Sequence, residues 1–146
     1  MHADAPMRAV ILLVDDDAGD QELTRRAFAE APVDLRIVSD GAEAIDYLRR
    51  QGNHAVDAPR PDIILLDLNM PRLDGREVLR RIRADAQLKD LVVIVLTTSD
   101  QDVDARACYA LHCNSFITKP VRVETFTAAM HEIGAYWFEL ATLPPV

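Results

Sequence analysis

Three short apolar runs constrain the fold of this chain more than any other feature. They are rich in β-branched side chains and cover residues 10–14, 63–66 and 91–96. Runs of this length are too short for a helix that is buried on every side, and they are typical of strands covered on both faces of a parallel sheet. Two weaker segments, residues 35–38 and 115–118, are predicted as further strands, the first of them nearer an edge.

The segments between these runs carry apolar residues at helical spacing. We expect helices over about residues 18–30, 41–50, 78–82, 105–112, and 123–137 or beyond. Strands that alternate with helices form a parallel sheet with helices on both faces, because the connections between parallel strands are right-handed. The sequence therefore predicts an α/β, doubly wound, five-stranded domain.

The length and the cysteine content fit one domain in a reducing compartment. At 146 residues we expect a single domain over 1–146, with a core over about 8–138 and a C-terminal arm over about 139–146. Cys108 and Cys113 match no Cys-x-x-Cys spacing, so buried free thiols are expected. With no long apolar stretch and no signal pattern at the N-terminus, we expect a cytoplasmic protein without a membrane partner.

The charge balance is acidic, with 24 Asp and Glu residues against 16 Lys and Arg residues and a formal net charge of −8. A non-specific nucleic-acid binder carries a basic patch instead, so no nucleic-acid partner is expected. Arg80, Arg81 and Arg83 are interpreted as a solvated helix face. His112 stands near the two cysteines, but no fourth ligand accompanies them, so we do not expect a zinc site.

Polar side chains follow four of the five predicted strands. Asp15 and Asp16 come after the first strand, Asp67 after the third, Thr97 after the fourth and Lys119 after the fifth. Ligands of open parallel sheets bind beyond the carboxyl ends of the strands, so we expect these side chains at one rim. Crowded carboxylates raise one another's pKa unless a cation lies between them, and Mg²⁺ prefers oxygen ligands.

This set of side chains suits phosphoryl transfer. Asp16 and Asp67 can supply two oxygens to Mg²⁺, and the backbone carbonyl of Asn69 a third. One carboxylate can instead act as a nucleophile and form an aspartyl phosphate, whose oxygens a metal, a lysine and a hydroxyl neutralise. Taken singly, Asp17 is explained as a helix N-cap and Lys119 as a surface charge. The coincidence at four strand ends favours a functional site.

With these residues, the sequence closely resembles the receiver domain of two-component response regulators over about residues 8–130. The acidic pair, the segment LLDLNMPRLDG, the threonine and the Lys-Pro pair occur in the family's order. The resemblance implies the flavodoxin-like receiver fold and Mg²⁺ as cofactor. The site residues that it implies are Asp67 as phosphoacceptor, Asp15, Asp16, Asp67 and the Asn69 carbonyl as metal ligands, and Thr97 and Lys119 as phosphate-binding groups.

The resemblance also implies a signalling role without enzymatic turnover. A partner histidine kinase would present a phosphohistidine, and Asp67 would attack it in line. Thr97 would then move toward the phosphate, and Phe116 would turn into the vacated space and shift an existing equilibrium. Because Phe116 lacks the hydroxyl of a tyrosine, this switch would rest on packing alone. As in the family, the Lys119–Pro120 bond is expected to be cis.

Two alternatives stay open. The first is a metal-dependent phosphohydrolase with an aspartyl-phosphate intermediate, although Asn69 stands where such enzymes usually have a second acid/base carboxylate. The second is an interaction module that is never phosphorylated, against which the intact set of Asp, Thr and Lys residues argues.

The end of the chain carries a narrower resemblance. Residues 135–144 and the long loop over about residues 52–61 resemble stand-alone response regulators of cyanobacterial and bacterial phytochromes. This implies a light-sensing histidine kinase as partner and a homodimer built on the C-terminal helix and arm. Four large apolar residues of this segment cannot all face one core from one helix, so some are expected at an interface unless the tail folds back on its own domain. They are Tyr136, Trp137, Phe138 and Leu140.

Overall fold

A five-stranded parallel sheet forms the centre of the molecule. The computed structural model describes residues 8–145; the N-terminal segment in which no export signal is expected and the final residue of the arm lie outside this range. The strands are arranged in the order β2-β1-β3-β4-β5. Their bounds are β1 (Ala9–Val14), β2 (Val33–Val38), β3 (Ile63–Leu66), β4 (Val92–Thr97) and β5 (Ser115–Thr118). The predicted α/β, doubly wound architecture is confirmed.

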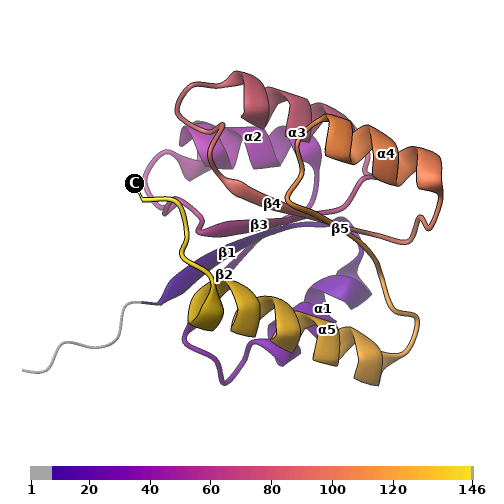
Figure 1. Ribbon diagram of the computed structural model, residues 1–146. Helices are drawn as coiled ribbons and strands as arrows, with labels where there is room; N and C mark the ends of the chain where they lie inside the picture. The colour runs from indigo at the N-terminus through magenta and orange to yellow at the C-terminus, as the bar shows by residue number, and fades with distance from the viewer. Residues whose placement is uncertain (1–7, 146) are drawn as a thin grey trace, which may run out of the picture.

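Helices cover both faces of this sheet (Figure 1). On one face lie α2 (Gly41–Arg49), α3 (Gly75–Ala84) and α4 (Asp102–Ala110), and on the other lie α1 (Ala18–Ala27) and α5 (Val123–Ala135). A short 3₁₀ turn, η1 (Gly52–His54), interrupts the loop before β3, and a π-helical turn, η2 (Tyr136–Leu140), extends α5.

Aspartates begin three of the five helices. The carboxylates of Asp17, Asp40 and Asp74 each accept a hydrogen bond from a backbone N–H of the first turn of α1, α2 and α3 respectively. The N-cap interpretation of Asp17 is thereby confirmed. Helix α4 differs, because Gln101 at its N-cap position makes no such side-chain bond.

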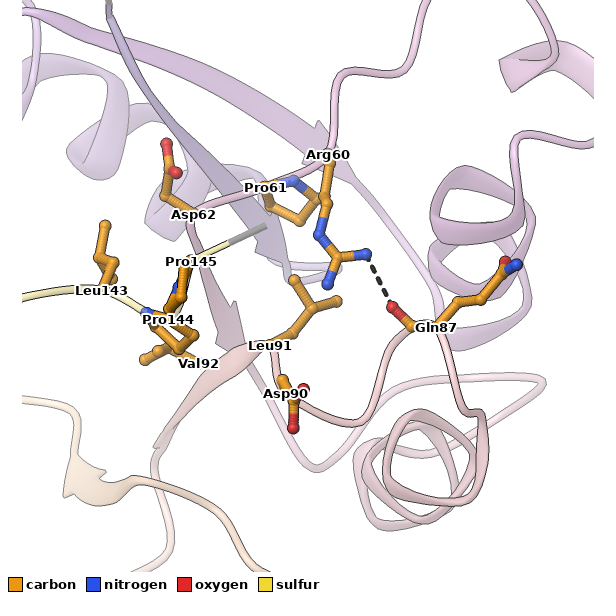
Figure 2. Close-up of a pocket in the computed structure, with 10 residues that line it drawn as sticks. All are labelled: Arg60, Pro61, Asp62, Gln87, Asp90, Leu91, Val92, Leu143, Pro144 and Pro145. Carbon is orange, nitrogen blue, oxygen red and sulfur yellow. Dashed lines mark hydrogen bonds between the residues drawn. The ribbon is translucent and has the colours of Figure 1, made fainter.

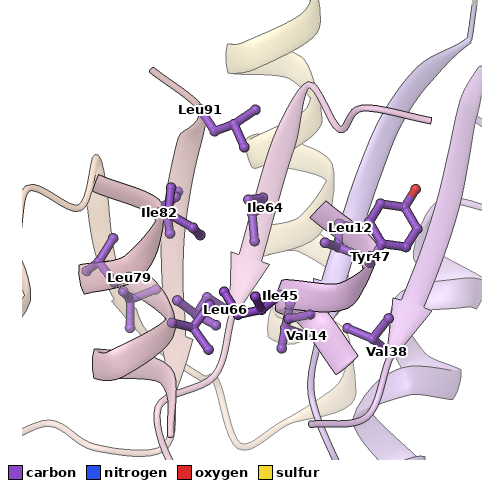
Figure 3. Close-up of a cluster of buried hydrophobic side chains, with 14 of the residues drawn as sticks. Leu12, Val14, Val38, Ile45, Tyr47, Ile64, Leu66, Leu79, Ile82 and Leu91 are labelled. Carbon is purple, nitrogen blue, oxygen red and sulfur yellow. The ribbon is translucent and has the colours of Figure 1, made fainter. Parts of the chain in front are cut away.

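The sheet separates two hydrophobic clusters. Alternate residues of β1 face opposite sides: Leu12 and Val14 pack toward α2 and α3, and Ile11 and Leu13 pack toward α1 and α5. Figure 3 shows part of the first cluster, in which side chains of β1 and β3 meet those of α2 and α3. Every residue of β3 and β4 is buried, as the apolar runs predicted. Both cysteines are buried and free.

The interpretation of Arg83 as a solvated side chain is wrong. Its guanidinium donates hydrogen bonds to the carbonyls of His112, Lys89 and Leu91 and to Oδ1 of Asn114, at 2.7–3.0 Å. Periodicity placed it on the outer face of α3 but could not show that these loops meet it there. Arg80 and Arg81 are exposed and pair with a glutamate of their own helix, as expected.

The C-terminal segment divides its large apolar side chains between two environments. Trp137 and Phe138 pack against the cluster beneath α1 and α5, and so does Leu143 of the arm. Tyr136 and Leu140 remain 51% and 76% exposed. The tail therefore folds back on its own domain in part, and two side chains are left uncovered. Across residues 8–145, no helix is long and apolar enough to cross a membrane.

Candidate functional site

Three carboxylates meet where β1 and β3 end. Asp15 and Asp16 follow β1 directly, and Asp67 follows β3, its neighbour in the sheet. A carboxylate oxygen from each lies within 4.8 Å of the other two. Asp15 and Asp67 are only 1% and 8% exposed, whereas Asp16 faces solvent. The predicted acidic rim is therefore present, with one open side.

A single ammonium group joins these carboxylates. Nζ of Lys119 lies 2.8 Å from Oδ2 of Asp15, 2.8 Å from Oδ2 of Asp20 and 3.4 Å from Oδ2 of Asp67. The lysine side chain is buried, because the end of β5 carries it across the rim. The sequence predicted its presence there. Its bridging position between α1 and two strands follows from the fold.

The contact with Asp20 was not predicted. This residue lies in the first turn of α1, where an acidic side chain is usually explained by the favourable interaction with the helix dipole. The recurrence of an aspartate at Asp20, soon after Asp15 to Asp17, was the available signal, but only the packing of α1 beside the rim brings this carboxylate to the lysine.

Burial and neighbouring charges shift the pKa values of Asp15 and Lys119 in opposite directions. Burial raises the pKa of Asp15 above its ordinary value, although the hydrogen bonds from Lys119 and from the backbone N–H of Asp17 oppose that shift. Burial alone lowers the pKa of Lys119, but its hydrogen bonds to Asp15 and Asp20 outweigh this, so the pKa is raised and the amine stays charged. The site thus holds a permanent cation among several anions.

Thr97 ends β4, the strand next to β3, and is completely buried. Its hydroxyl oxygen accepts a hydrogen bond from the backbone N–H of Ser99 at 3.3 Å, and its carbonyl accepts one from the backbone N–H of Lys119 at 2.6 Å. Phe116 lies on β5, half-buried against the cluster on the α2, α3 and α4 face. The hydroxyl of Tyr109 accepts a hydrogen bond from the Phe116 backbone N–H.

The expectation of a cis peptide bond between Lys119 and Pro120 is wrong for this structure. Every peptide bond within residues 8–145 is trans. The trans form is the default even before proline, where it is favoured by about 0.5–1 kcal/mol. With this trans bond, Lys119 already reaches the carboxylates.

The donor set of the rim suits a hard divalent cation. Carboxylate oxygens of Asp15, Asp16 and Asp67 converge on one region, and Lys119 alone does not balance their charge. Mg²⁺ prefers such oxygen ligands and keeps several waters, for which the exposed side of Asp16 leaves room. Asn69 follows two residues after Asp67 in an exposed part of the loop.

The cavity in Figure 2 lies away from this rim. It measures about 420 Å³ and opens at the amino ends of β3 and β4, between Asp62, Leu91 and the C-terminal Pro144. The carboxylate of Asp62 accepts a hydrogen bond from the backbone N–H of Val10, and the guanidinium of Arg60 donates one to the carbonyl of Gln87. The arm thus packs at the amino ends of these strands, whereas the acidic rim lies at the carboxyl ends.

Comparison with known proteins explains why these residues occur together. Residues 11–131 match the response regulator receiver domain family. The chain is a member of this family. The receiver is 41% identical over 137 residues to the response regulator Rcp1 of Synechocystis sp., a match that covers 92% of each chain.

Solved structures give the same relationship. A structure of the phosphorylated cyanobacterial phytochrome response regulator RcpA shares 42% identity and a TM-score of 0.90 with this receiver, over 94% of this chain and 99% of that one. The Mn²⁺-bound form of Rcp1 shares 38% identity and a TM-score of 0.84 over the same shares of the two chains. The receiver fold expected from the sequence is therefore confirmed.

Proposed function

We propose that this receiver is a single-domain response regulator that accepts a phosphoryl group from a partner histidine kinase onto Asp67. The observation that carries the proposal is the buried Asp67 carboxylate, which lies beside the Lys119 ammonium and within 4.8 Å of two further carboxylates. A nucleophile needs this proximity to positive charge, because a phosphoryl group brings negative charge of its own. The protein signals by changing shape and has no substrate turnover.

Each residue of the rim has a part in the transfer. An oxygen of Asp67 forms a bond to phosphorus while the bond from phosphorus to the kinase histidine nitrogen breaks, and the imidazole leaves. Lys119 neutralises charge on the phosphoryl oxygens, and the Thr97 hydroxyl donates a hydrogen bond to one of them. In this structure the hydroxyl is buried and its oxygen accepts a hydrogen bond from the Ser99 backbone N–H, and we propose that the segment after β4 moves as the hydroxyl approaches the phosphoryl oxygens. Phe116 then repacks as the switch residue.

Mg²⁺ is the proposed cofactor. Asp15, Asp16, Asp67 and the carbonyl of Asn69 would hold it, and when bound it supplies positive charge close to the phosphoryl oxygens. The convergence of three carboxylates supports this assignment, and the relative Rcp1 has been solved with Mn²⁺ bound.

The partner that we propose is a phytochrome histidine kinase in the cytoplasm. This proposal rests on RcpA, described as a phytochrome response regulator, and on a regulator of R. palustris red light signalling, which is 37% identical with a TM-score of 0.87. We propose neither a nucleic acid nor a membrane as a partner of this receiver.

We also propose a homodimer built on α5, η2 and the arm. Tyr136 and Leu140 lie one turn apart and are exposed, whereas Trp137 and Phe138 pack on their own domain. An exposed pair of large apolar side chains near the chain's end is typical of a surface that a partner covers.

Intact mass after incubation with acetyl phosphate and Mg²⁺ tests the proposed phosphoryl acceptance. The parent chain should gain one phosphoryl group, a chelator should abolish the gain, and Asp67→Asn should gain none. A parent chain that stays unlabelled while folded, both with acetyl phosphate and with phosphorylated kinase, contradicts the proposal and favours an interaction module. Steady release of phosphate from a generic ester favours the phosphohydrolase instead.

A further inference from the structure

A polar network outside the acidic rim connects α3, α4 and the segment after β4. Oγ of Ser99 donates a hydrogen bond to Oδ2 of Asp104 at 2.5 Å, and the guanidinium of Arg76 donates to Oδ1 of the same carboxylate at 2.5 Å. The two bonds hold the pKa of Asp104 below its usual range, so this carboxylate is charged at neutral pH. The Asp104 carboxylate, in the first turn of α4, thus links Ser99 to Arg76 of α3.

Besides the hydrogen bond from the Phe116 backbone N–H to the Tyr109 hydroxyl, this network is the main polar attachment of helix α4. Of its side chains only Cys108 is buried, and its N-cap residue Gln101 makes no side-chain capping bond. The backbone N–H of Gln101 instead donates to Oγ of Ser99 at 3.2 Å. A short helix with one buried residue has little hydrophobic anchoring, so its polar contacts fix its position.

The network reaches the phosphate-binding threonine through Ser99. The Ser99 backbone N–H donates a hydrogen bond to the hydroxyl oxygen of Thr97. The Ser99 carbonyl accepts a hydrogen bond from Oγ1 of Thr118 on β5 at 3.0 Å. Ser99 is therefore held from α4 and from β5 at once. Thr97 cannot turn toward Asp67 without disturbing at least one of these bonds.

The other end of the network is rigid. Arg76 is the second residue of α3, and α3 begins at Gly75, whose N–H donates to the carbonyl of Leu68 at 2.9 Å. A Cβ at this glycine would lie 2.2 Å from the carbonyl oxygen of Asp67, so no space separates the helix start from the loop after Asp67. Arg76 therefore extends from a fixed point beside the phosphoacceptor.

We propose that Arg76 and Asp104 are positioning residues that latch Ser99, and through it Thr97, in the resting conformation of the receiver. This latch rests on the proposed phosphoryl acceptance at Asp67 and adds a control on its rate. Release of the latch frees the segment after β4, so that the Thr97 hydroxyl reaches the phosphoryl oxygens. Breaking the latch raises the population of the competent conformation before any phosphoryl group is bound.

The rate of self-phosphorylation by acetyl phosphate with Mg²⁺ tests the latch in the full chain. Arg76→Ala and Asp104→Ala should each raise this rate by about twofold to fivefold, the range expected for loss of one partly exposed ion pair that biases a two-state equilibrium. The double variant should be no faster than Asp104→Ala alone, because loss of the Asp104 carboxylate already removes the bonds to both Arg76 and Ser99. Arg76→Lys keeps the charge and should return the rate toward that of the parent.

Arg80→Ala is the matched control. It lies on the same helix and also pairs with a carboxylate, but its partner Glu77 belongs to α3 itself. We expect the parent rate and an unchanged thermal midpoint for this variant. The Asp104→Asn variant, which keeps an acceptor for Ser99 and loses the ion pair, provides a milder second measurement if an alanine variant fails to fold.

The possible results distinguish failure of the latch from failure of the proposed phosphoryl acceptance at Asp67. A parent that is phosphorylated and latch variants that match its rate, or that fall below it, overturn the latch and leave the phosphoacceptor standing. A lower thermal midpoint without any change of rate assigns the network a purely structural role and overturns the latch as well. A parent that takes up no phosphoryl group removes the proposed function and the latch with it.

Discussion

At the scale of single residues, Lys119 determines the electrostatics of the rim. Its ammonium contacts three carboxylates in a nearly dry setting, so loss of this one charge leaves several anions facing one another. The same ammonium occupies the region where a divalent cation and a phosphoryl group are proposed to bind. The stability of the folded receiver and its affinity for cations are therefore coupled at this residue.

Lys119→Met should lower the free energy of unfolding by about 3 kcal/mol in the presence of a chelator, because it leaves buried carboxylates without their partner. Added Mg²⁺ should restore part of this loss, since a cation that binds only the folded chain stabilises it. Urea unfolding with and without Mg²⁺ measures both effects. Lys89→Met, which removes the only other lysine from an exposed position, is the control. Equal stabilisation of the two variants by Mg²⁺ contradicts the account.

The thiols give a prediction of pH dependence. Burial raises the pKa of Cys108, and it raises the pKa of Cys113 to about 11. Because the thiolate is the reactive form, the folded chain should resist iodoacetamide at pH 8 and become more reactive as the pH approaches 11. In denaturant at pH 8 both thiols should react readily, which mass spectrometry detects. Rapid labelling of the native protein at pH 8 runs against this expectation.

The residue-level predictions from the sequence were most accurate where a strand fixed the position. Asp15 and Asp67 follow strands with strong apolar patterns and Lys119 follows a weaker one, and their meeting could be predicted from the sheet alone. Asp20 and Arg83 lie on helices, and their contacts depend on which loop or helix packs beside them. A single sequence carries little information about that packing.

At the scale of elements, the start of α3 is held against neighbouring backbone by a close approach. Gly75 begins this helix against the backbone of the loop that carries Asp67, and a Cβ there would lie 2.2 Å from the Asp67 carbonyl oxygen and 2.8 Å from Cα of Leu68. Both neighbours are backbone atoms, which cannot move aside as a flexible side chain can. The position of Asp67 thus depends on the lack of a Cβ at Gly75.

Gly75→Ala should lower the free energy of unfolding by about 1–3 kcal/mol, the usual cost of overpacking, and should slow phosphorylation of Asp67. Gly134→Ala is the matched control near the end of α5, where the helix continues into η2 and the nearest atom to an added Cβ is an aromatic carbon of Phe28 at 3.4 Å. There alanine should stabilise by about 0.5–1 kcal/mol through its higher helix propensity. Thermal and urea unfolding give both values; equal effects of the two substitutions speak against a close approach at Gly75.

The bounds of elements were predictable to within a few residues. The apolar run 91–96 became β4 at Val92–Thr97, and the weak run 35–38 became the longer edge strand Val33–Val38. Helix α1 ends at Ala27 although the pattern continued to about residue 30. Pro32 lies just beyond, and the residue before a proline disfavours helical geometry.

At the scale of the whole molecule, the C-terminal segment packs in part on its own domain and leaves Tyr136 and Leu140 exposed. The π-helical turn closes with a hydrogen bond from the Ala141 N–H to the Tyr136 carbonyl at 2.7 Å. Trp137 packs inward and Leu140 outward. The sequence showed that these side chains could not all share one core, but it could not show which of them faced inward.

Substitutions on the two sides of this segment should separate stability from association. Leu140→Ser should reduce the dimer fraction in sedimentation velocity and leave the thermal midpoint unchanged, since its side chain is exposed. Trp137→Ala should lower the free energy of unfolding by about 2–4 kcal/mol, because truncation of a partly buried aromatic removes apolar packing. A parent that stays monomeric at high concentration, or a Leu140→Ser variant that associates as the parent does, contradicts the proposed dimer.

The chemical position of the phosphoryl group is the most direct measurement of the central claim. Borohydride reduces an aspartyl phosphate to the corresponding alcohol, so the reduced side chain identifies the acceptor after proteolysis and fragment mass analysis. We predict reduction at Asp67 alone, and none when the chain is incubated without Mg²⁺. Reduction at Asp15, Asp16 or Asp20 instead, or a stable label that borohydride does not reduce, would contradict the account of this rim.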